Sequence, residues 1–271
     1  MNMDSLRIAA AVVNAPIGKI DHNLAQVTRW TRMAAEQEVR LICFPEMNLT
    51  GYVHNETAGD WAQSIPGPAT HALAELARET GVTILAGMAE KDTDGRLFIV
   101  HLAANPDGRL DVYRKLHLAP PEQAIFTPGD EVSLFEVASL TCGIQLCYDA
   151  HFPELTTRMA LGGADIIFVP HASPSRGQTA RDKHKSWMRH LTARSYDNGL
   201  FIVACNQTGR NGNGLEFPGN AVVIDPSGNI LAKKLDDKEG LVVVDLEGSA
   251  LEHVRGHRMR YFLPNRRPDM Y

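Results

Sequence analysis

The chain has 271 residues, 44% of them hydrophobic, which is enough to bury a full core. Its formal net charge of -5 offers no basic surface that would attract nucleic acid or an anionic membrane. No basic and apolar leader opens the sequence, and no apolar run approaches the roughly 18 residues of a membrane span. We therefore predict one domain over residues 1–271, located in the cytoplasm, with no nucleic-acid or membrane partner.

The cysteine content argues against a disulfide scaffold. Four cysteines are spread over the chain: Cys43, Cys142, Cys147 and Cys205. So few in a chain of this length are typical of a reducing compartment, and we expect four free thiols. A free cysteine is by default a buried packing residue, so a reactive role needs support from other parts of the sequence.

The first half of the chain predicts alternating strands and helices. Apolar runs without alternation are typical of strands covered on both faces, and apolar residues at helical spacing mark the segments between them. The predicted strands are residues 6–13, 41–44, 82–89, 97–103 and 110–114, and the predicted helices are residues 22–38, capped by Asp21, and 69–80. Residues 115–130 form a proline-rich loop whose length is more typical of a functional loop than of a simple connection.

The second half repeats this order. It predicts strands at residues 141–146, 165–169, 200–204, 220–224, 230–232 and 241–245, with helices at 153–161 and 180–197. Two such halves favour an α/β fold of four layers, in which two buried sheets pack face to face and the helices lie outside.

Three polar residues stand where predicted strands end. Glu46 follows Pro45, Lys115 opens the proline-rich loop, and Cys147 lies where an apolar run turns polar. Taken singly, these are most simply a solvated glutamate, a surface lysine and a buried thiol. Catalytic groups nevertheless collect at the carboxyl ends of strands, where the loops stand clear of the sheet.

The flanking residues connect these three positions. Phe44-Pro45-Glu46, Tyr113-Arg114-Lys115 and Cys147-Tyr148-Asp149 resemble the three signature segments of the carbon-nitrogen hydrolase (nitrilase) superfamily, and further matches extend over nearly the whole chain. The resemblance implies a four-layer αββα sandwich of the nitrilase type. It also implies a Glu-Lys-Cys triad that hydrolyses non-peptide C–N bonds in small molecules, without a cofactor or a metal ion.

The resemblance also implies a role for each residue. A free thiol has a pKa of about 8.5 and is mostly protonated at neutral pH, so Cys147 needs an adjacent base to act as a nucleophile. Glu46 is that base, and Lys115 holds the oxyanion together with the backbone N–H of Tyr148. Glu122, in the loop after Lys115, matches a second glutamate that orients the substrate and supports the lysine.

The residues after the nucleophile bear on the substrate. True nitrilases usually carry Cys-Trp-Glu, whereas Cys147-Tyr148-Asp149 is similar to the amidase and carbamoylase branches. We therefore expect a small amide substrate. N-carbamoyl amines and nitriles remain alternatives, and so does a catalytically silent binding or scaffold member of the fold.

Further residues are candidates for the substrate pocket. Besides Tyr148, we expect Tyr52, His171 and Ser173 to line it. Asn206 either closes the pocket or caps a strand that ends at residue 204. Arg176 either pairs with a substrate carboxylate or belongs to a solvated run of charges.

Two rival mechanisms use histidines. A Cys-His hydrolase would take His117, His151 or His171 as its base, but such a mechanism has no role for Lys115. A metal hydrolase could use His253 and His257, although no third ligand accompanies them in the sequence.

The arginine-rich end of the chain, from about residue 255 to 271, has the composition of a basic tail. The resemblance implies instead that it crosses to a partner subunit. We therefore predict a homodimer or a higher homo-oligomer.

Overall fold

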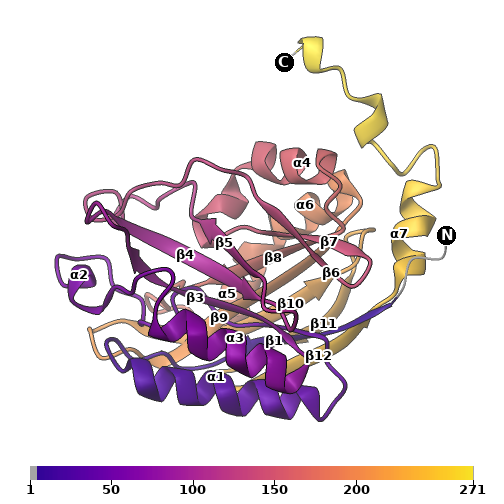
Figure 1. The fold of residues 1–271 in the computed structure, drawn as a ribbon. Coiled ribbons are helices and arrows are strands. Elements are labelled where there is room, and N and C mark those ends of the chain that lie inside the picture. The colour runs from indigo at the N-terminus through magenta and orange to yellow at the C-terminus, as the bar shows by residue number, and fades with distance from the viewer. Residues whose placement is uncertain (1–4, 271) are drawn as a thin grey trace.

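The computed structural model describes residues 5–270 and contains two six-stranded mixed sheets that pack face to face (Figure 1). Sheet A contains, in spatial order, β12 (Gly240–Leu246), β1 (Leu6–Val12), β2 (Leu41–Cys43), β3 (Thr83–Lys91), β4 (Leu97–Ala104) and β5 (Leu110–Arg114). Sheet B contains β11 (Ile230–Lys234), β10 (Glu216–Ile224), β9 (Phe201–Arg210), β8 (Ile166–His171), β7 (Leu140–Ile144) and β6 (Leu134–Val137).

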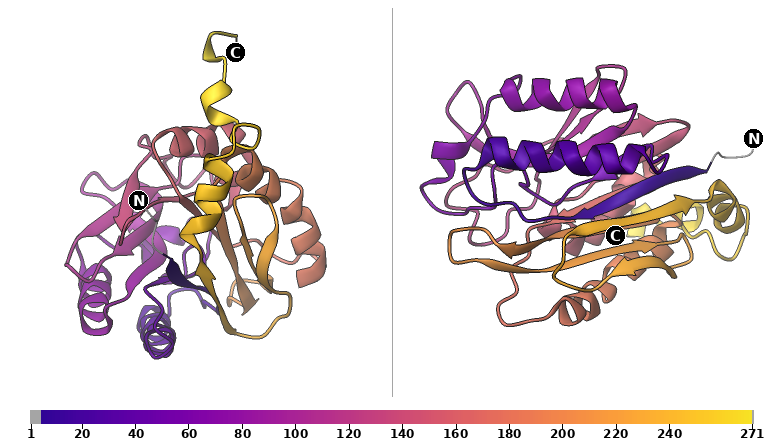
Figure 2. Two further views of the ribbon diagram at one scale, coloured as in Figure 1. Left: turned by 90° about the vertical axis from the view of Figure 1, so that its right-hand side faces the viewer. Right: turned by 90° about the horizontal axis from the view of Figure 1, so that it is seen from below.

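Helices cover the outer face of each sheet (Figure 2). Sheet A is covered by α1 (Ile20–Ala35) and α3 (Pro68–Thr80), and sheet B by α4 (Pro153–Leu161), α5 (Ala180–Met188) and α6 (Leu191–Asn198). One apolar cluster fills the space between the sheets and continues between sheet B and its helices, and a second lies between sheet A and its helices. The predicted four-layer αββα sandwich is thereby confirmed. The remaining short elements are α2 (Ala58–Trp61), α7 (Gly248–Arg255) and the 3-10 turns η1 (Cys147–His151), η2 (Leu263–Asn265) and η3 (Pro268–Met270).

The central strands of both sheets are parallel and are buried on both faces. β1, β2 and β3 run parallel in sheet A, and β7, β8 and β9 run parallel in sheet B. This explains their continuous apolar sequences, because neither face of such a strand meets water. It also brings the carboxyl ends of β2, β7 and β8 to the same region of the sandwich, where the loops that follow them meet.

The predicted limits of the first helix were wrong. Asp21 does not cap it, because the carbonyl of Lys19 already accepts a hydrogen bond from the backbone N–H of Asn23 at 2.8 Å. Asp21 lies instead in the first turn, where a negative charge is favourable. The helix ends at Ala35 rather than at Glu38, whose φ of +59° is left-handed and cannot continue it.

Several elements of the second half differ from the prediction or were not predicted. The helix predicted over residues 180–197 is two helices, α5 and α6, because His190 leaves helical geometry between them. β6 was missed, since it is an edge strand of only four residues. β9 continues to Arg210 because its pairing with β10 continues through polar residues, and β12 returns to sheet A to pair with β1.

The end of the chain projects from the body of the molecule beyond α7 (Figures 1 and 2). Met259 and Met270 are 76% and 67% exposed, whereas the Phe262 ring contacts Tyr196 of α6 at 5.4 Å between centroids. The contact of this segment with a partner subunit stays a prediction. Within residues 5–270, no helix has the length and apolar composition needed to cross a membrane.

Candidate functional site

Glu46, Lys115 and Cys147 follow β2, β5 and β7 respectively. Glu46 is anchored to the opposite sheet, because the side-chain amide of Gln207 in β9 donates to its backbone carbonyl at 2.8 Å. The Glu46 side chain is held from sheet B as well. Its Oε2 accepts a hydrogen bond at 2.9 Å from the backbone N–H of Ala172, which follows β8. The site therefore lies where the loops of the two sheets meet.

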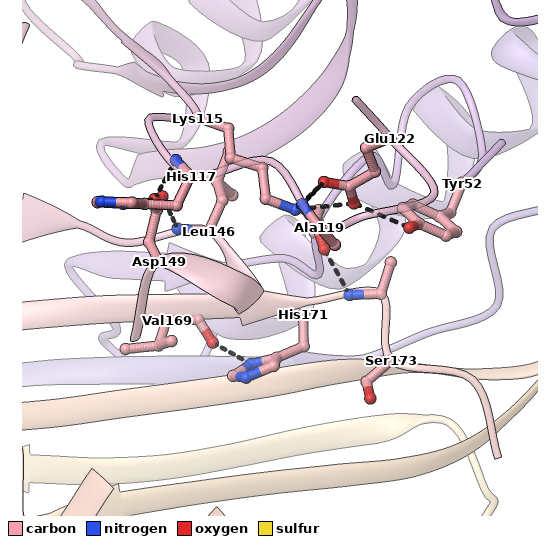
Figure 3. Close-up of polar contacts among 12 residues, drawn as sticks. Tyr52, Lys115, His117, Ala119, Glu122, Leu146, Asp149, Val169, His171 and Ser173 are labelled. Carbon is pink, nitrogen blue, oxygen red and sulfur yellow. Dashed lines mark hydrogen bonds and ion pairs between the residues drawn. The ribbon is translucent and has the colours of Figure 1, made fainter. Parts of the chain in front are cut away.

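Lys115 is the centre of a fully buried polar cluster. Its Nζ lies 2.8 Å from Oε1 of Glu46. It also lies 2.8 Å from both carboxylate oxygens of Glu122 (Figure 3). Glu122 is held in turn by the hydroxyl of Tyr52 and by the backbone N–H of Ala119, each at 2.8 Å. Every charge in the cluster thus has a partner, as burial requires.

Burial and neighbouring charges shift the pKa values of this cluster. Burial raises the pKa of Glu46 to about 7, even though Lys115 opposes the shift, and Glu122 adds to it. Burial alone would lower the pKa of Lys115, but Glu46 and Glu122 outweigh burial and raise it. Glu46 can therefore exchange a proton near neutral pH while Lys115 stays charged, which is the division expected between a general base and a fixed cation.

Cys147 stands on a strained turn. It opens η1 three residues after β7 ends at Ile144, and its φ of +46° is unusual for a residue with a Cβ. Unlike Cys43, Cys142 and Cys205, which are fully buried, it is partly exposed.

The Cys147 thiol lies within the electrostatic field of the cluster. Its pKa is raised by burial and by the charge of Glu46, and lowered by Lys115. Because the net shift is upward, the resting group is a thiol rather than a thiolate. A nucleophilic role therefore requires proton transfer to a base at the moment of attack.

Asp149 connects the turn of Cys147 to the loop of Lys115. Its buried carboxylate accepts hydrogen bonds from the backbone N–H of Leu146 at 3.0 Å, the backbone N–H of His117 at 2.8 Å and the hydroxyl of Tyr113 at 2.8 Å. Nδ1 of His117 lies 2.9 Å from the same carboxylate. These contacts join the segments that carry the thiol and the lysine, so Asp149 has a structural role that its position in the motif did not reveal.

The loop between β8 and α5 forms another side of the site. The side-chain amide of Asn206 accepts a hydrogen bond from the backbone N–H of Ser173 at 2.9 Å and donates to its carbonyl at 3.0 Å. Asn206 lies inside β9, so the alternative in which it caps a strand ending at residue 204 is wrong. Its contacts hold this loop against the site.

The other pocket candidates are held by aromatic and polar contacts. His171 is buried, its ring stacks on Trp187 at 4.1 Å between centroids, and its Nδ1 lies 2.7 Å from the Val169 carbonyl (Figure 3). A carbonyl only accepts, so Nδ1 carries the proton. The Tyr148 ring packs against those of His151 and Phe152. Tyr52 reaches the cluster through Glu122.

The histidines of the rival mechanisms have other partners. Nδ1 of His117 is engaged by Asp149 and that of His171 by Val169, while the ring of His151 packs against that of His190 at 4.6 Å between centroids. Among residues 5–270, no group of three or more His, Cys, Asp or Glu side chains is arranged to hold a metal ion.

Several residues of the site were not identified from the sequence. They are Gln207 and the backbone amides of Ala119 and Ala172, which hold the two glutamates. No sequence signal marks a backbone N–H that binds a distant carboxylate. Gln207 could have been noticed as a polar residue following a buried strand.

Comparison with known proteins identifies the family of the chain. The sequence profile described as carbon-nitrogen hydrolase matches residues 9–255. A nitrilase of Pyrococcus abyssi is 29% identical over 270 residues, which cover 98% of this chain and 99% of the relative. The omega-amidase NIT2 of Mus musculus is 27% identical over 279 residues, which cover 99% and 98%.

Solved structures give the same result. An amidase from Nesterenkonia sp. superposes with a TM-score of 0.83 and 27% sequence identity, covering 98% of this chain and 94% of that one. A variant of that amidase shows covalent addition of the acetamide moiety of fluoroacetamide at its active-site cysteine. With the family profile covering most of its length, the chain belongs to the carbon-nitrogen hydrolase family, whose members are enzymes that act on non-peptide C–N bonds.

Proposed function

We propose that this enzyme hydrolyses the C–N bond of a small amide through a thioester on Cys147. The observation that carries the proposal is the buried cluster in which Lys115 binds Glu46 and Glu122 at 2.8 Å, with the Cys147 thiol in its field. Such a cluster supplies a base with a pKa near neutrality and a permanent cation, both buried, beside a partly exposed nucleophile.

The first half-reaction acylates the enzyme. Glu46 takes the thiol proton as the sulfur of Cys147 bonds to the amide carbon, and the carbonyl oxygen becomes an oxyanion. Lys115 and the backbone N–H of Tyr148 stabilise that charge, since an N–H in the first turn of η1 has no partner within the turn. The C–N bond then breaks, and Glu46 returns its proton to the departing nitrogen, releasing ammonia or an amine.

The second half-reaction restores the enzyme. Glu46, again unprotonated, takes a proton from a water molecule whose oxygen attacks the thioester carbon. The C–S bond breaks, a carboxylic acid leaves, and Cys147 recovers its proton. One base thus acts in both halves, and its pKa near 7 suits it to accept and to return a proton.

An amide is favoured over a nitrile by the Tyr148-Asp149 sequence after the nucleophile and by the relatives named omega-amidase and amidase. The covalent adduct on the cysteine of the Nesterenkonia amidase supports a route through an acylated thiol. N-carbamoyl amines and nitriles are the alternatives to be tested beside amides.

The test measures ammonia release from a panel of small amides, N-carbamoyl amines and nitriles. We expect turnover of amides by the wild-type protein and none by Cys147→Ala, with circular dichroism checking that the variant is folded. Mass spectrometry after rapid acid quenching should detect the acyl group on the peptide containing Cys147. Retained turnover in Cys147→Ala would exclude the nucleophile, and turnover of nitriles alone would exclude the amide.

A further inference from the structure

A second lysine lies beside the site, and its environment differs from that of Lys115. Lys183, in the first turns of α5, is partly buried, and its Nζ lies 3.0 Å from the hydroxyl of Ser173. Within the part of the chain that the structure describes, no carboxylate lies within 4.0 Å of this ammonium group. In the described structure, this cation is bound by a single neutral hydroxyl.

Lys185, on the same helix, shows how a lysine charge is usually accommodated, by an ion pair and by exposure to solvent. Its ammonium group lies 3.7 Å from Asp182, and its side chain is 76% exposed. A charge removed from water is costly unless an opposite charge compensates it. Lys183 is half-buried and has no such charge among the described residues, so its position favours an anion that comes from outside the chain.

Ser173 connects Lys183 to the catalytic cluster. The backbone of Ser173 is held on both sides by Asn206, and the preceding residue, Ala172, donates to Glu46. The hydroxyl that binds Lys183 is therefore one residue away from a direct contact of the general base. Lys183 lies at the site, not on a remote surface.

Electrostatic effects agree with this placement. Burial lowers the pKa of Lys183, while Cys147 raises it and Arg176 lowers it. The ammonium group is thus in the field of both the thiol and the guanidinium. Arg176 lies in the same loop, is exposed, and has a φ of +46°, a conformation that is strained for a residue with a Cβ.

We propose that Lys183, assisted by Arg176, binds a carboxylate at the end of the substrate opposite the hydrolysed C–N bond. The substrate class is then the monoamides of short dicarboxylic acids. This inference rests on the proposed amidase function. Glu46 and Glu122 lie around Lys115, so their charges repel a substrate carboxylate from that side and leave the Lys183 side for it.

The experiment compares substrates that differ only in the distal charge. Glutaramic acid and pentanamide share a carbon chain and differ in a carboxylate against a methyl group, as do N-carbamoyl-β-alanine and N-propylurea. The readout is the ratio of kcat/KM for the charged over the neutral member of each pair, in which a general loss of activity cancels. We expect wild-type protein to prefer glutaramic acid over pentanamide, and a preference confined to the urea pair would overturn the assignment to dicarboxylic monoamides.

The variants assign the preference to one side chain. In Lys183→Met the ratio should fall about 10- to 100-fold, since a charge-assisted hydrogen bond contributes about 1.5–3 kcal/mol. Lys183→Arg should keep most of the preference. Lys185→Met is the matched control on the same helix and should leave the ratio unchanged. An unchanged ratio in folded Lys183→Met would overturn the proposal.

A measurement on wild-type protein covers the case in which Lys183→Met does not fold. The KM for glutaramic acid should rise with sodium chloride concentration while that for pentanamide stays constant, because salt screens a partly exposed ion pair. Equal responses of the two substrates would overturn the carboxylate site. If pentanamide is hydrolysed as well as glutaramic acid, only this inference is refuted. If no member of either pair is hydrolysed, the amidase function itself is refuted.

Discussion

Two lysines interact electrostatically with the Cys147 thiol, and the regions around them differ in how the lysine charge is compensated. Lys115 is fully buried and binds two carboxylates, which raise its pKa. Lys183 is partly buried, binds a hydroxyl, and has a lowered pKa. The first charge is neutralised by the protein itself, and the second is left without a carboxylate in the described structure.

This difference gives the two lysines different expected roles, one in catalysis and the other in substrate selection. A cation that is already paired and fixed costs no reorganisation when an oxyanion develops near it, so Lys115 is suited to the transition state. A cation that lacks its counter-charge gains most when a charged ligand arrives, so Lys183 is suited to choosing the substrate. Substitutions in the two regions should therefore affect different kinetic quantities.

The largest effect is expected from Lys115→Met. Loss of an oxyanion donor should lower kcat by about 100- to 1000-fold. The variant also leaves Glu46 and Glu122 buried without their cation, which should destabilise the fold by about 3–5 kcal/mol. Steady-state kinetics and urea unfolding measure the two effects, with Lys185→Met as the surface control. A change confined to KM would place Lys115 in substrate binding and remove the distinction between the two lysines.

The pH dependence of kcat/KM tests the base. Glu46 accepts a proton only when ionised, and its pKa is raised to about 7 by burial. Activity should therefore fall as pH drops through 7, by about tenfold per pH unit once Glu46 is mostly protonated. Buffers from pH 5 to 8 at constant ionic strength give the profile. A rate that stays constant down to pH 5 would exclude Glu46 as the base.

The smallest effect is expected from Glu122→Gln. This variant keeps a side chain of similar shape but removes one of the two charges on Lys115, and kcat/KM should fall about tenfold, which is about 1.4 kcal/mol. The negative charge of Glu122 also raises the pKa of Glu46, so its removal should move the acidic limb of the pH profile to lower pH. A limb that stays in place would show that the two carboxylates do not interact.

Part of this site can be predicted from short segments of the sequence. Glu46, Lys115 and Cys147 each carry flanking residues that mark the end of a strand, and their order along the chain indicates the family. The buried strands are also visible, because a strand covered on both faces has a continuous apolar sequence. The helix of residues 180–197 was predicted as one element because its break at His190 has no glycine or proline.

The sequence by itself determined the fold class and indicated the three residues of the proposed triad, because both can be recognised from short sequence segments. Only the tertiary structure decided which groups hold them. Gln207 reaches Glu46 across 161 residues, and Lys183 meets Ser173 where a loop turns back on its helix. Such contacts depend on how the two sheets and their loops pack together, and no local pattern of residue types encodes that packing.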